Sequence, residues 1–176
     1  MSGGQHQKGC NHFVFTIENF LAIENIEPMV RMIDHEIKTN LCTTVPKYQS
    51  YNDMHIKYKD DECFKTFITK VEDEAKKHIA NKLQLSSCWF NVIKDDSDCL
   101  GLSGFHTHNT DVTCVYFLQN CWGNGTLFQF NNSILQLQVK DNSLVIFNPS
   151  LSHGISEWKD KDRYSVVVDF NEEKNA

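Results

Sequence analysis

Three histidines in the C-terminal half of the chain have the spacing of a metal site. His106 and His108 are two residues apart, so in an extended strand their side chains project to the same side. His153 follows an apolar run and a proline-containing turn. Neutral imidazoles bind iron, zinc, copper or nickel, and three ligands on one face of an ion leave positions open for small molecules. The sequence therefore predicts a mononuclear metal site at these histidines.

An arginine follows the third histidine at the start of a predicted strand. Arg163 can hold a carboxylate through two parallel hydrogen bonds, a grip that lysine cannot match. Ser165 lies two residues further along the same strand, so it faces the same side and can donate another hydrogen bond. The alternative is a surface cation beside Asp160 and Asp162. The position of Arg163 after His153 favours the first interpretation, in which it binds an organic-acid co-substrate.

Composition limits what surrounds this site. With 176 residues, 40% hydrophobic and 23% charged, the chain can bury one sizeable core but is short for two. We expect a single domain over residues 1–176, with residues 1–10 as a flexible tail. A net charge of -6 gives no global basic field, so no nucleic-acid partner and no anionic membrane surface are indicated.

The cysteines and the N-terminus indicate a location. The seven cysteines include no Cys-x-x-Cys pair, and their odd number argues against a closed disulfide framework. Residues 1–8 lack the apolar stretch of a secretory signal, and no run reaches the length that spans a bilayer. The sequence therefore favours a cytoplasmic, reducing compartment, which would suit iron(II).

Helices are predicted in the first half of the chain. Pro28 is expected in the first turn of one helix, and the apolar residues after it recur at helical spacing. A second helix is expected to begin with Asp60 or Asp61 as its N-cap. Its predicted apolar stripe comprises Phe64, Phe67, Ile68, Val71, Ala75, Ile79 and Leu83.

From Cys88 to Asn171 the pattern changes to strands and turns, which we expect to form the β core. The predicted strands are Trp89–Ile93, Val112–Leu118, Thr126–Phe130, Ile134–Val139, Ser143–Phe147 and Arg163–Phe170. Turns are expected at Gly123–Gly125 and Asp141–Ser143. Helices followed by short antiparallel strands indicate an α+β fold, with helices buttressing one face of a β-sandwich or open barrel.

The stretch from about Trp89 to Asn171 resembles the double-stranded β-helix (jelly-roll, cupin-like) core of the iron(II)- and 2-oxoglutarate-dependent dioxygenases. The likeness is greatest to their prolyl-hydroxylase-like branch and to small phage and bacterial oxygenases. It is carried by the ordered set Val112–Leu118, Leu144–Gly154 and Arg163–Val168. The region Phe13–Lys38 is also similar to the lead-in strand and helix of that branch.

The resemblance implies a reaction and its co-substrates. Iron(II) would be held by the histidines, 2-oxoglutarate would chelate it and meet Arg163 through its far carboxylate, and dioxygen would complete the set. Oxidative decarboxylation to succinate and carbon dioxide would be coupled to hydroxylation of a prime substrate. A peptidyl residue such as proline is the first expectation for that substrate, and a small metabolite the second. Loops such as Lys47–Lys59 and Asp95–Gly104 would wall it.

Two positions depart from the family pattern. His108 stands where the family usually has aspartate or glutamate, although the small oxygenases often show His-x-His; Asp111 is the reserve ligand. Phe117 stands where prolyl hydroxylases place a tyrosine whose hydroxyl helps to hold the co-substrate. Another group would then have to assist the arginine, and Ser165 and Asn91 are the candidates.

Two other readings remain open. A three-histidine cupin, for instance a thiol dioxygenase, would bind iron without a 2-oxo acid. Cupins usually carry a glutamate four positions after the second histidine, where this chain has Val112, and they offer no role for Arg163. The other reading is an inactive binding module of the same fold, against which the intact histidines and arginine argue.

Overall fold

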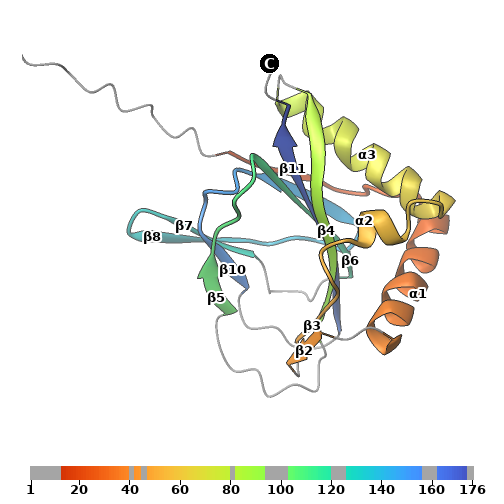
Figure 1. Cartoon of the computed structure of the whole chain (residues 1–176). Coiled ribbons are helices and arrows are strands. Elements are labelled where there is room, and N and C mark those ends of the chain that lie inside the picture. Colours follow the sequence, from red (N-terminus) through yellow and green to blue (C-terminus); the bar gives the residue numbers. More distant parts are fainter. Residues whose placement is uncertain are drawn as a thin grey trace, which may run out of the picture.

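The computed structural model describes residues 13–39, 42–44, 47–79, 82–93, 103–119, 126–155 and 162–173. Within these residues the helices are α1 (Ile23–Thr39), α2 (Met54–Lys57) and α3 (Glu62–His78). The strands are β1 (Val14–Ile17), β2 (Cys42–Thr44), β3 (Lys47–Gln49), β4 (Leu83–Ile93), β5 (Ser103–His106), β6 (Val112–Gln119), β7 (Thr126–Phe130), β8 (Ser133–Leu137), β9 (Ser143–Phe147), β10 (His153–Ile155) and β11 (Arg163–Glu172) (Figure 1). Helices come mainly first and strands later, which confirms the predicted α+β class.

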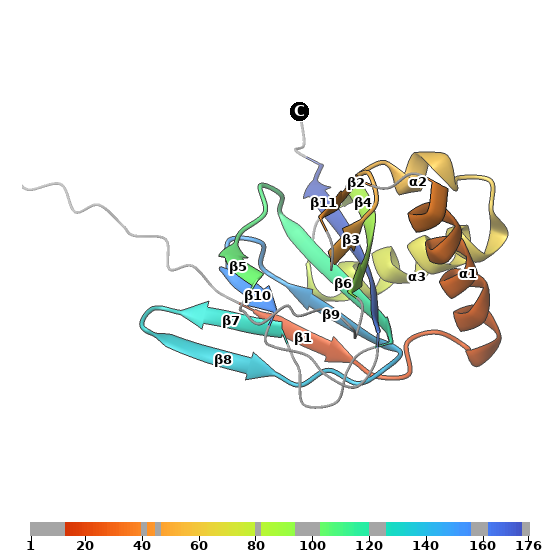
Figure 2. The ribbon, with the colours of Figure 1, turned by 90° about the horizontal axis from the view of Figure 1, so that it is seen from below.

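The described strands form two antiparallel sheets. The larger has the order β1-β9-β6-β11-β4-β3-β2, and the smaller has the order β5-β10-β7-β8. Figure 2 shows α1 and α3 on one side of the larger sheet and the smaller sheet on the other. The helices therefore buttress one face of the larger sheet, as the sequence predicted.

Side chains of the central strand β11 alternate between these two sides. Tyr164, Val166, Val168 and Phe170 belong to the hydrophobic core shared with the helices. The alternate residues of the strand, Arg163, Ser165, Val167 and Asp169, line a cavity on the opposite face. Since successive side chains of a strand point to opposite faces, one strand supplies both the core and the polar cavity.

Helix α3 begins where the sequence predicted. The Asp61 carboxylate accepts a hydrogen bond from the backbone N–H of Phe64 at 2.9 Å, so Asp61 is the N-cap. The buried face of the helix is Phe64, Phe67, Val71 and Ala75. The predicted stripe was wrong at its end, because α3 stops at His78, so Ile79 is its C-cap and Leu83 opens β4.

Helix α1 begins earlier than predicted. It starts at Ile23, so Pro28 lies inside the helix and not in its first turn. Proline has no N–H, so α1 lacks one helical hydrogen bond there. Burial of Met29, Met32, Ile33 and Ile37 against the sheet stabilises the helix nevertheless.

The turn before β9 ties the larger sheet to the start of α1. Asn142 has a φ of 56°, a left-handed conformation that asparagine adopts more readily than most residues. Its side-chain Oδ1 accepts hydrogen bonds from Leu21 N at 2.8 Å and Tyr116 Oη at 2.9 Å, and its Nδ2 donates to Leu21 O at 2.8 Å. The turn predicted at Asp141–Ser143 is present. The turn expected at Gly123–Gly125 and the tail expected at residues 1–10 lie outside the described residues.

Three of the cysteines can be assessed. Cys63, Cys88 and Cys114 are free thiols, while the expected absence of a disulfide framework concerns all seven cysteines and stays a prediction. Burial raises the pKa of the thiols of Cys88 and Cys114. A protonated buried thiol packs as a small apolar group, so these two residues serve the core.

Candidate metal centre

Two of the three predicted histidines face each other across a pair of short strands. His106 ends β5 and His153 opens β10, and the two residues are direct partners in the antiparallel register. Partners opposite each other in such a pair have Cα atoms about 4.5–5.5 Å apart. Their ring centroids lie 4.3 Å apart. Strand pairing thus brings together residues that are far apart in the sequence.

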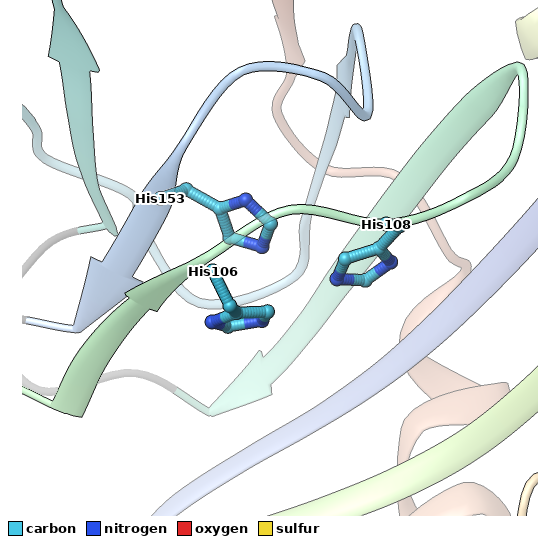
Figure 3. Close-up of side chains that lie close together, drawn as sticks. All are labelled: His106, His108 and His153. Carbon is cyan, nitrogen blue, oxygen red and sulfur yellow. The ribbon is translucent and has the colours of Figure 1, made fainter.

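The third histidine joins them from the segment between the sheets. His108 lies beyond the end of β5, and its backbone N–H donates to Pro149 O at 3.0 Å, in the turn that precedes β10. The ring centroid of His108 is 5.3 Å from that of His106 and 5.0 Å from that of His153. Figure 3 shows the three rings gathered around a common space. The sequence predicted a single straight strand here, whereas the strand ends between the two histidines of the triplet.

The separation of the rings suits a shared ion. One nitrogen from each of His106, His108 and His153 lies within 4.8 Å of the others. Two nitrogen ligands of one ion can be at most about 4 Å apart, since each bond is about 2.1 Å. Small shifts of the rings would therefore bring all three onto one metal.

Hydrogen bonds set which nitrogen of each ring is available. The Nδ1 atoms of His106 and His153 lie 3.2 Å from Gly104 O and 3.0 Å from Leu151 O, respectively. The Nδ1 atom of His108 lies 3.0 Å from both carboxylate oxygens of Asp169. Because carbonyl and carboxylate oxygens only accept, each Nδ1 carries the hydrogen and each Nε2 keeps the lone pair that binds a metal. The donor set therefore fits a three-nitrogen metal site.

Burial keeps His153 in the form that binds metals. The side chain is 6% exposed, and desolvation lowers its pKa to about 4. The hydrogen bond to Leu151 O acts in the opposite direction but is the smaller effect. At neutral pH the ring is therefore uncharged, and no proton competes for its lone pair.

The histidines open onto a cavity of about 530 Å³ whose far end is polar. Arg163 lies there, 4% exposed, with its guanidinium carbon 4.8 Å from the centroid of the Phe117 ring. Ser165 is the direct cross-strand partner of Asn91, and Asn91 is that of Gln49, so these three polar residues form a row beside the arginine. The residues expected to bind a carboxylate thus share one end of the cavity.

One polar atom in this row has room for a ligand. The Oδ1 atom of Asn91 is buried and has no hydrogen-bond partner among the described residues. A buried acceptor left in this state costs roughly 1–3 kcal/mol, so a donor group on a ligand or an ordered water would be favoured there. Tyr116 offers no help, because its hydroxyl bonds Asn142 on the helix side of the sheet.

The reserve ligand Asp111 lies apart from the histidine cluster. Its side chain is exposed, and its Oδ2 accepts a hydrogen bond from the backbone N–H of Glu172 at 2.8 Å. Among the described residues that could jointly hold a metal, Asp111 does not appear with the histidines. The structure therefore brings together every other predicted site residue but not this one.

Sequence reasoning selected few residues of the cavity wall and missed several polar ones. Gln49 belongs to the region Lys47–Lys59, which was expected to be a loop but contains β3 and α2. Thr126 comes from the first position of β7. Asp169 is six residues after Arg163 on the same strand, and this even spacing is the one signal that could have found it. Of the other expected loop, Asp95–Gly104, nearly all lies outside the described residues.

Comparisons with known proteins were informative only at the level of structure. No family model matches the chain, and no curated protein matches its sequence. HygX from Streptomyces hygroscopicus, solved with nickel and 2-oxoglutarate bound, matches with a TM-score of 0.72, 9% identity, and coverage of 91% of this chain and 83% of that one. A prolyl hydroxylase from Trichoplax adhaerens, in complex with a hypoxia-inducible-factor peptide, has a TM-score of 0.68 and 13% identity, covering 91% and 84%. The 2-oxoglutarate-dependent epimerase SnoN from nogalamycin biosynthesis has a TM-score of 0.70 and 9% identity, covering 90% and 77%.

These neighbours share one fold. The chain has the double-stranded β-helix fold of the 2-oxoglutarate- and iron(II)-dependent oxygenases, which confirms the fold class expected from the sequence. The three-histidine cluster lies in the cavity of that fold. At 9–13% identity the likeness concerns the fold, and the chemistry must be argued from this chain's own residues.

Proposed function

We propose that the protein is an iron(II)- and 2-oxoglutarate-dependent oxygenase. The observation that carries the proposal is the joint presence, in one cavity, of three histidines with available Nε2 atoms and a buried arginine beside amide and hydroxyl groups. A metal site alone would also suit a cupin. The buried cation at the other end of the cavity favours a co-substrate with a free carboxylate.

In this proposal His106, His108 and His153 hold the iron. Iron(II) with bound 2-oxoglutarate supplies the oxidising chemistry, in which dioxygen converts the 2-oxo acid to succinate and carbon dioxide and one oxygen atom is left for the prime substrate. The protein contributes neutral ligands held at fixed orientations by their Nδ1 hydrogen bonds. Three ligands on one face leave room for a chelating acid and dioxygen.

Arg163, Ser165 and Asn91 bind the far carboxylate, and Asn91 does so through its NH₂ group because a carboxylate only accepts hydrogen bonds. The guanidinium carbon lies 4.8 Å from the centroid of the Phe117 ring, and burial strengthens the attraction of the guanidinium for an anion. The Ser165 hydroxyl and the Asn91 amide stand next to it in the neighbouring positions of β11 and β4. Val115 and Val167 form an apolar wall between the two ends of the cavity, which excludes water from the bound acid.

In this proposal the prime substrate contacts the remaining polar and aromatic lining of the cavity, which includes Asn52, Ser87, Trp89, Asn109 and Thr110. The described wall here offers amides, hydroxyls and one indole, which suits an uncharged polar group. A peptidyl residue such as proline is the first candidate and a small metabolite the second, with hydroxylation as the expected reaction. Release of succinate, screened against pools of peptides, amino acids, nucleotides and small metabolites, would identify the substrate.

The carboxylate grip is tested by Arg163→Ala and Arg163→Lys. Both variants are expected to bind cobalt(II) normally but to bind 2-oxoglutarate roughly 10–100-fold more weakly, because a charged hydrogen-bonded pair contributes about 1.5–3 kcal/mol. Lysine keeps the charge but not the two-pronged geometry, so it is expected to rescue binding only in part. Calorimetric titration of the cobalt-loaded protein with 2-oxoglutarate measures the change.

A matched control is available in the chain's other arginine. Arg31 forms an exposed ion pair with Glu27 on α1, and Arg31→Ala is expected to leave both affinities unchanged. Unchanged 2-oxoglutarate affinity in the Arg163 variants would sink the assignment of the grip. Metal binding without any 2-oxoglutarate binding or succinate formation in the unmodified protein would favour the cupin or the inactive binding module.

A further inference from the structure

A buried carboxylate stands directly behind one of the three histidines. Asp169, on β11, is 4% exposed, and both of its oxygens lie 3.0 Å from Nδ1 of His108. The His108 side chain is itself only 8% exposed. The contact therefore lies out of bulk solvent, where a charge acts most strongly on its neighbours.

Two hydroxyl groups fix the carboxylate in place. Thr113 Oγ1 donates to Asp169 Oδ1 at 2.7 Å, and Ser87 Oγ donates to Asp169 Oδ2 at 3.4 Å. These residues come from the strands on either side of β11, with Thr113 and Ser87 as direct cross-strand partners of Asp169. The carboxylate is thus held from both sides and has one remaining direction, toward the imidazole.

The buried charge needs a positive partner. A carboxylate taken out of water is costly unless hydrogen bonds and an opposite charge compensate it. The hydroxyls and the imidazole N–H supply hydrogen bonds, but an imidazole that binds a metal through Nε2 must be neutral, so as a ligand His108 itself would bring no net charge. A metal ion on Nε2 of His108 would supply it through the ring, in the carboxylate–histidine–metal arrangement.

We propose that Asp169 is the positioning residue of the metal centre: it holds His108 with Nε2 toward the ion and provides the negative charge that an acidic ligand would otherwise bring. The inference rests on the proposed function only in requiring a metal at the three histidines. It explains how a neutral residue is accommodated at position 108, since the anion lies behind the ligand ring. It applies whatever the prime substrate is.

The test is the affinity for cobalt(II) of metal-free Asp169→Asn, measured by competition with a chelator. The amide has the same shape, and its oxygen can still accept from His108 and from one hydroxyl, while the other hydroxyl can turn to accept from its NH₂ group, so charge is the main loss. The expected result is 10–100-fold weaker binding, the usual effect of losing such a partner. Asp111→Asn is the matched control, because it removes an exposed carboxylate close to His108 in the sequence, and its affinity is expected to stay within about threefold.

Nuclear magnetic resonance of the zinc-loaded unmodified protein gives a second readout that needs no variant. The ring of His108 is expected to bind zinc through Nε2 and to show an Nδ1 proton shifted downfield by its hydrogen bond to the carboxylate. In Asp169→Asn this proton alone should move, while those of His106 and His153 stay in place. A merely structural aspartate would not produce that selective change.

The outcomes separate the two proposals. Failure of the unmodified protein to bind cobalt(II) or zinc(II) would overturn both the metal site and the role of Asp169. Normal metal binding with equal affinities for the unmodified protein and Asp169→Asn, or zinc on Nδ1 of His108, would overturn the role of Asp169 alone. Weaker binding in Asp169→Asn and not in Asp111→Asn, with the selective proton shift, supports it.

Discussion

At position 108 the chain carries a neutral ring where related sites usually carry an acid, and its neighbourhood is adapted to the ring. Replacing His108 by Asp would remove the N–H that Asp169 accepts and would put a second carboxylate near a buried one. Like charges at such a distance repel strongly when little water separates them. Restoring the commoner ligand type at this position is therefore expected to harm the protein.

The predicted cost is about 1–3 kcal/mol of unfolding free energy in metal-free His108→Asp, the range for a buried group that loses its partner. Adding Asp169→Asn is expected to recover part of it, with a coupling of about 0.5–3 kcal/mol between the two changes. Urea unfolding of the unmodified protein, the two single variants and the double variant measures this double-mutant cycle. His106→Asp is the control, because the His106 ring lies beside Gly104 O and not beside Asp169, so adding Asp169→Asn should recover less of the lost unfolding free energy. Strictly additive effects at positions 108 and 169 would refute the prediction.

The histidines and Arg163 could be selected from the sequence because they occur as an ordered set, although neither a lone His-x-His nor a lone arginine is specific. Asp169 was not selected, since an aspartate in a strand carries no signal of its own until its neighbours are known. The partners that define it, Thr113 and Ser87, come from strands distant in the sequence. A residue that acts by positioning another residue therefore cannot be identified from a single sequence.

At the scale of elements, the turn before β9 is the point where the sheet fixes the start of α1. Asn142→Asp is predicted to cost about 1–3 kcal/mol, because a carboxylate oxygen would replace the NH₂ group that donates to Leu21 O. The two oxygens would repel each other, while the acceptor for Tyr116 would remain. Thermal or urea unfolding measures the loss.

Asn131 provides the control for this change. It has nearly the same backbone conformation, with a φ of 53°, and lies exposed in the turn between β7 and β8. Asn131→Asp is expected to alter the unfolding free energy by less than about 0.5 kcal/mol, as surface changes usually do. Equal effects at the two positions would show that the backbone conformation, and not the hydrogen bonds of Asn142, sets the cost.

Strands of at least five residues left a pattern in the sequence, although the start of β4 was missed, whereas the shorter strands of the site left none. Thr126–Phe130 and Ser143–Phe147 were expected with the bounds that β7 and β9 have. The strands β5 and β10, which carry His106 and His153, are only 4 and 3 residues long, too short for any periodicity to appear. These segments are strands because β5 pairs with β10 and β10 also pairs with β7. Such long-range pairing leaves no pattern in the local sequence.

At the scale of the whole molecule, the proposed metal site joins the two sheets. His106 and His153 belong to the smaller sheet, whereas His108 is bonded to Asp169 in the larger one. Between these sheets lies the cavity. An ion bound by all three rings would therefore connect the sheets directly, in addition to the chain segments between them.

Metal binding is accordingly predicted to stabilise the fold. A ligand present at about 100 times its dissociation constant adds about 2.7 kcal/mol to the unfolding free energy, which corresponds to a rise in Tm of roughly 5–10 °C for a chain of this size. Differential scanning fluorimetry with cobalt(II) measures the rise, and a chelator should reverse it. In His106→Ala, where an exposed ring is removed, the rise should be much smaller; an equal rise would mean that cobalt binds elsewhere.

In the described part of the chain, no helix is both long enough and apolar enough to cross a membrane. The hydrophobic core on the helix side and the cavity lie on opposite faces of the same larger sheet. Stability and the proposed chemistry therefore depend on the same central strands, and the variants above must be compared for stability as well as for binding.

The alternation along β11 also limits how such a chain can change over time. Arg163, Ser165, Val167 and Asp169 lie two apart, so inserting or deleting one residue between them would turn every later side chain to the opposite face. A guanidinium or a carboxylate would then enter the apolar core. A change of length by one residue in this strand is tolerable only where a β-bulge absorbs it, and register shifts of that kind already occur between Tyr164 and Ser165 and between Asp169 and Phe170. The strand therefore constrains the parity of a residue count as well as the types of its residues.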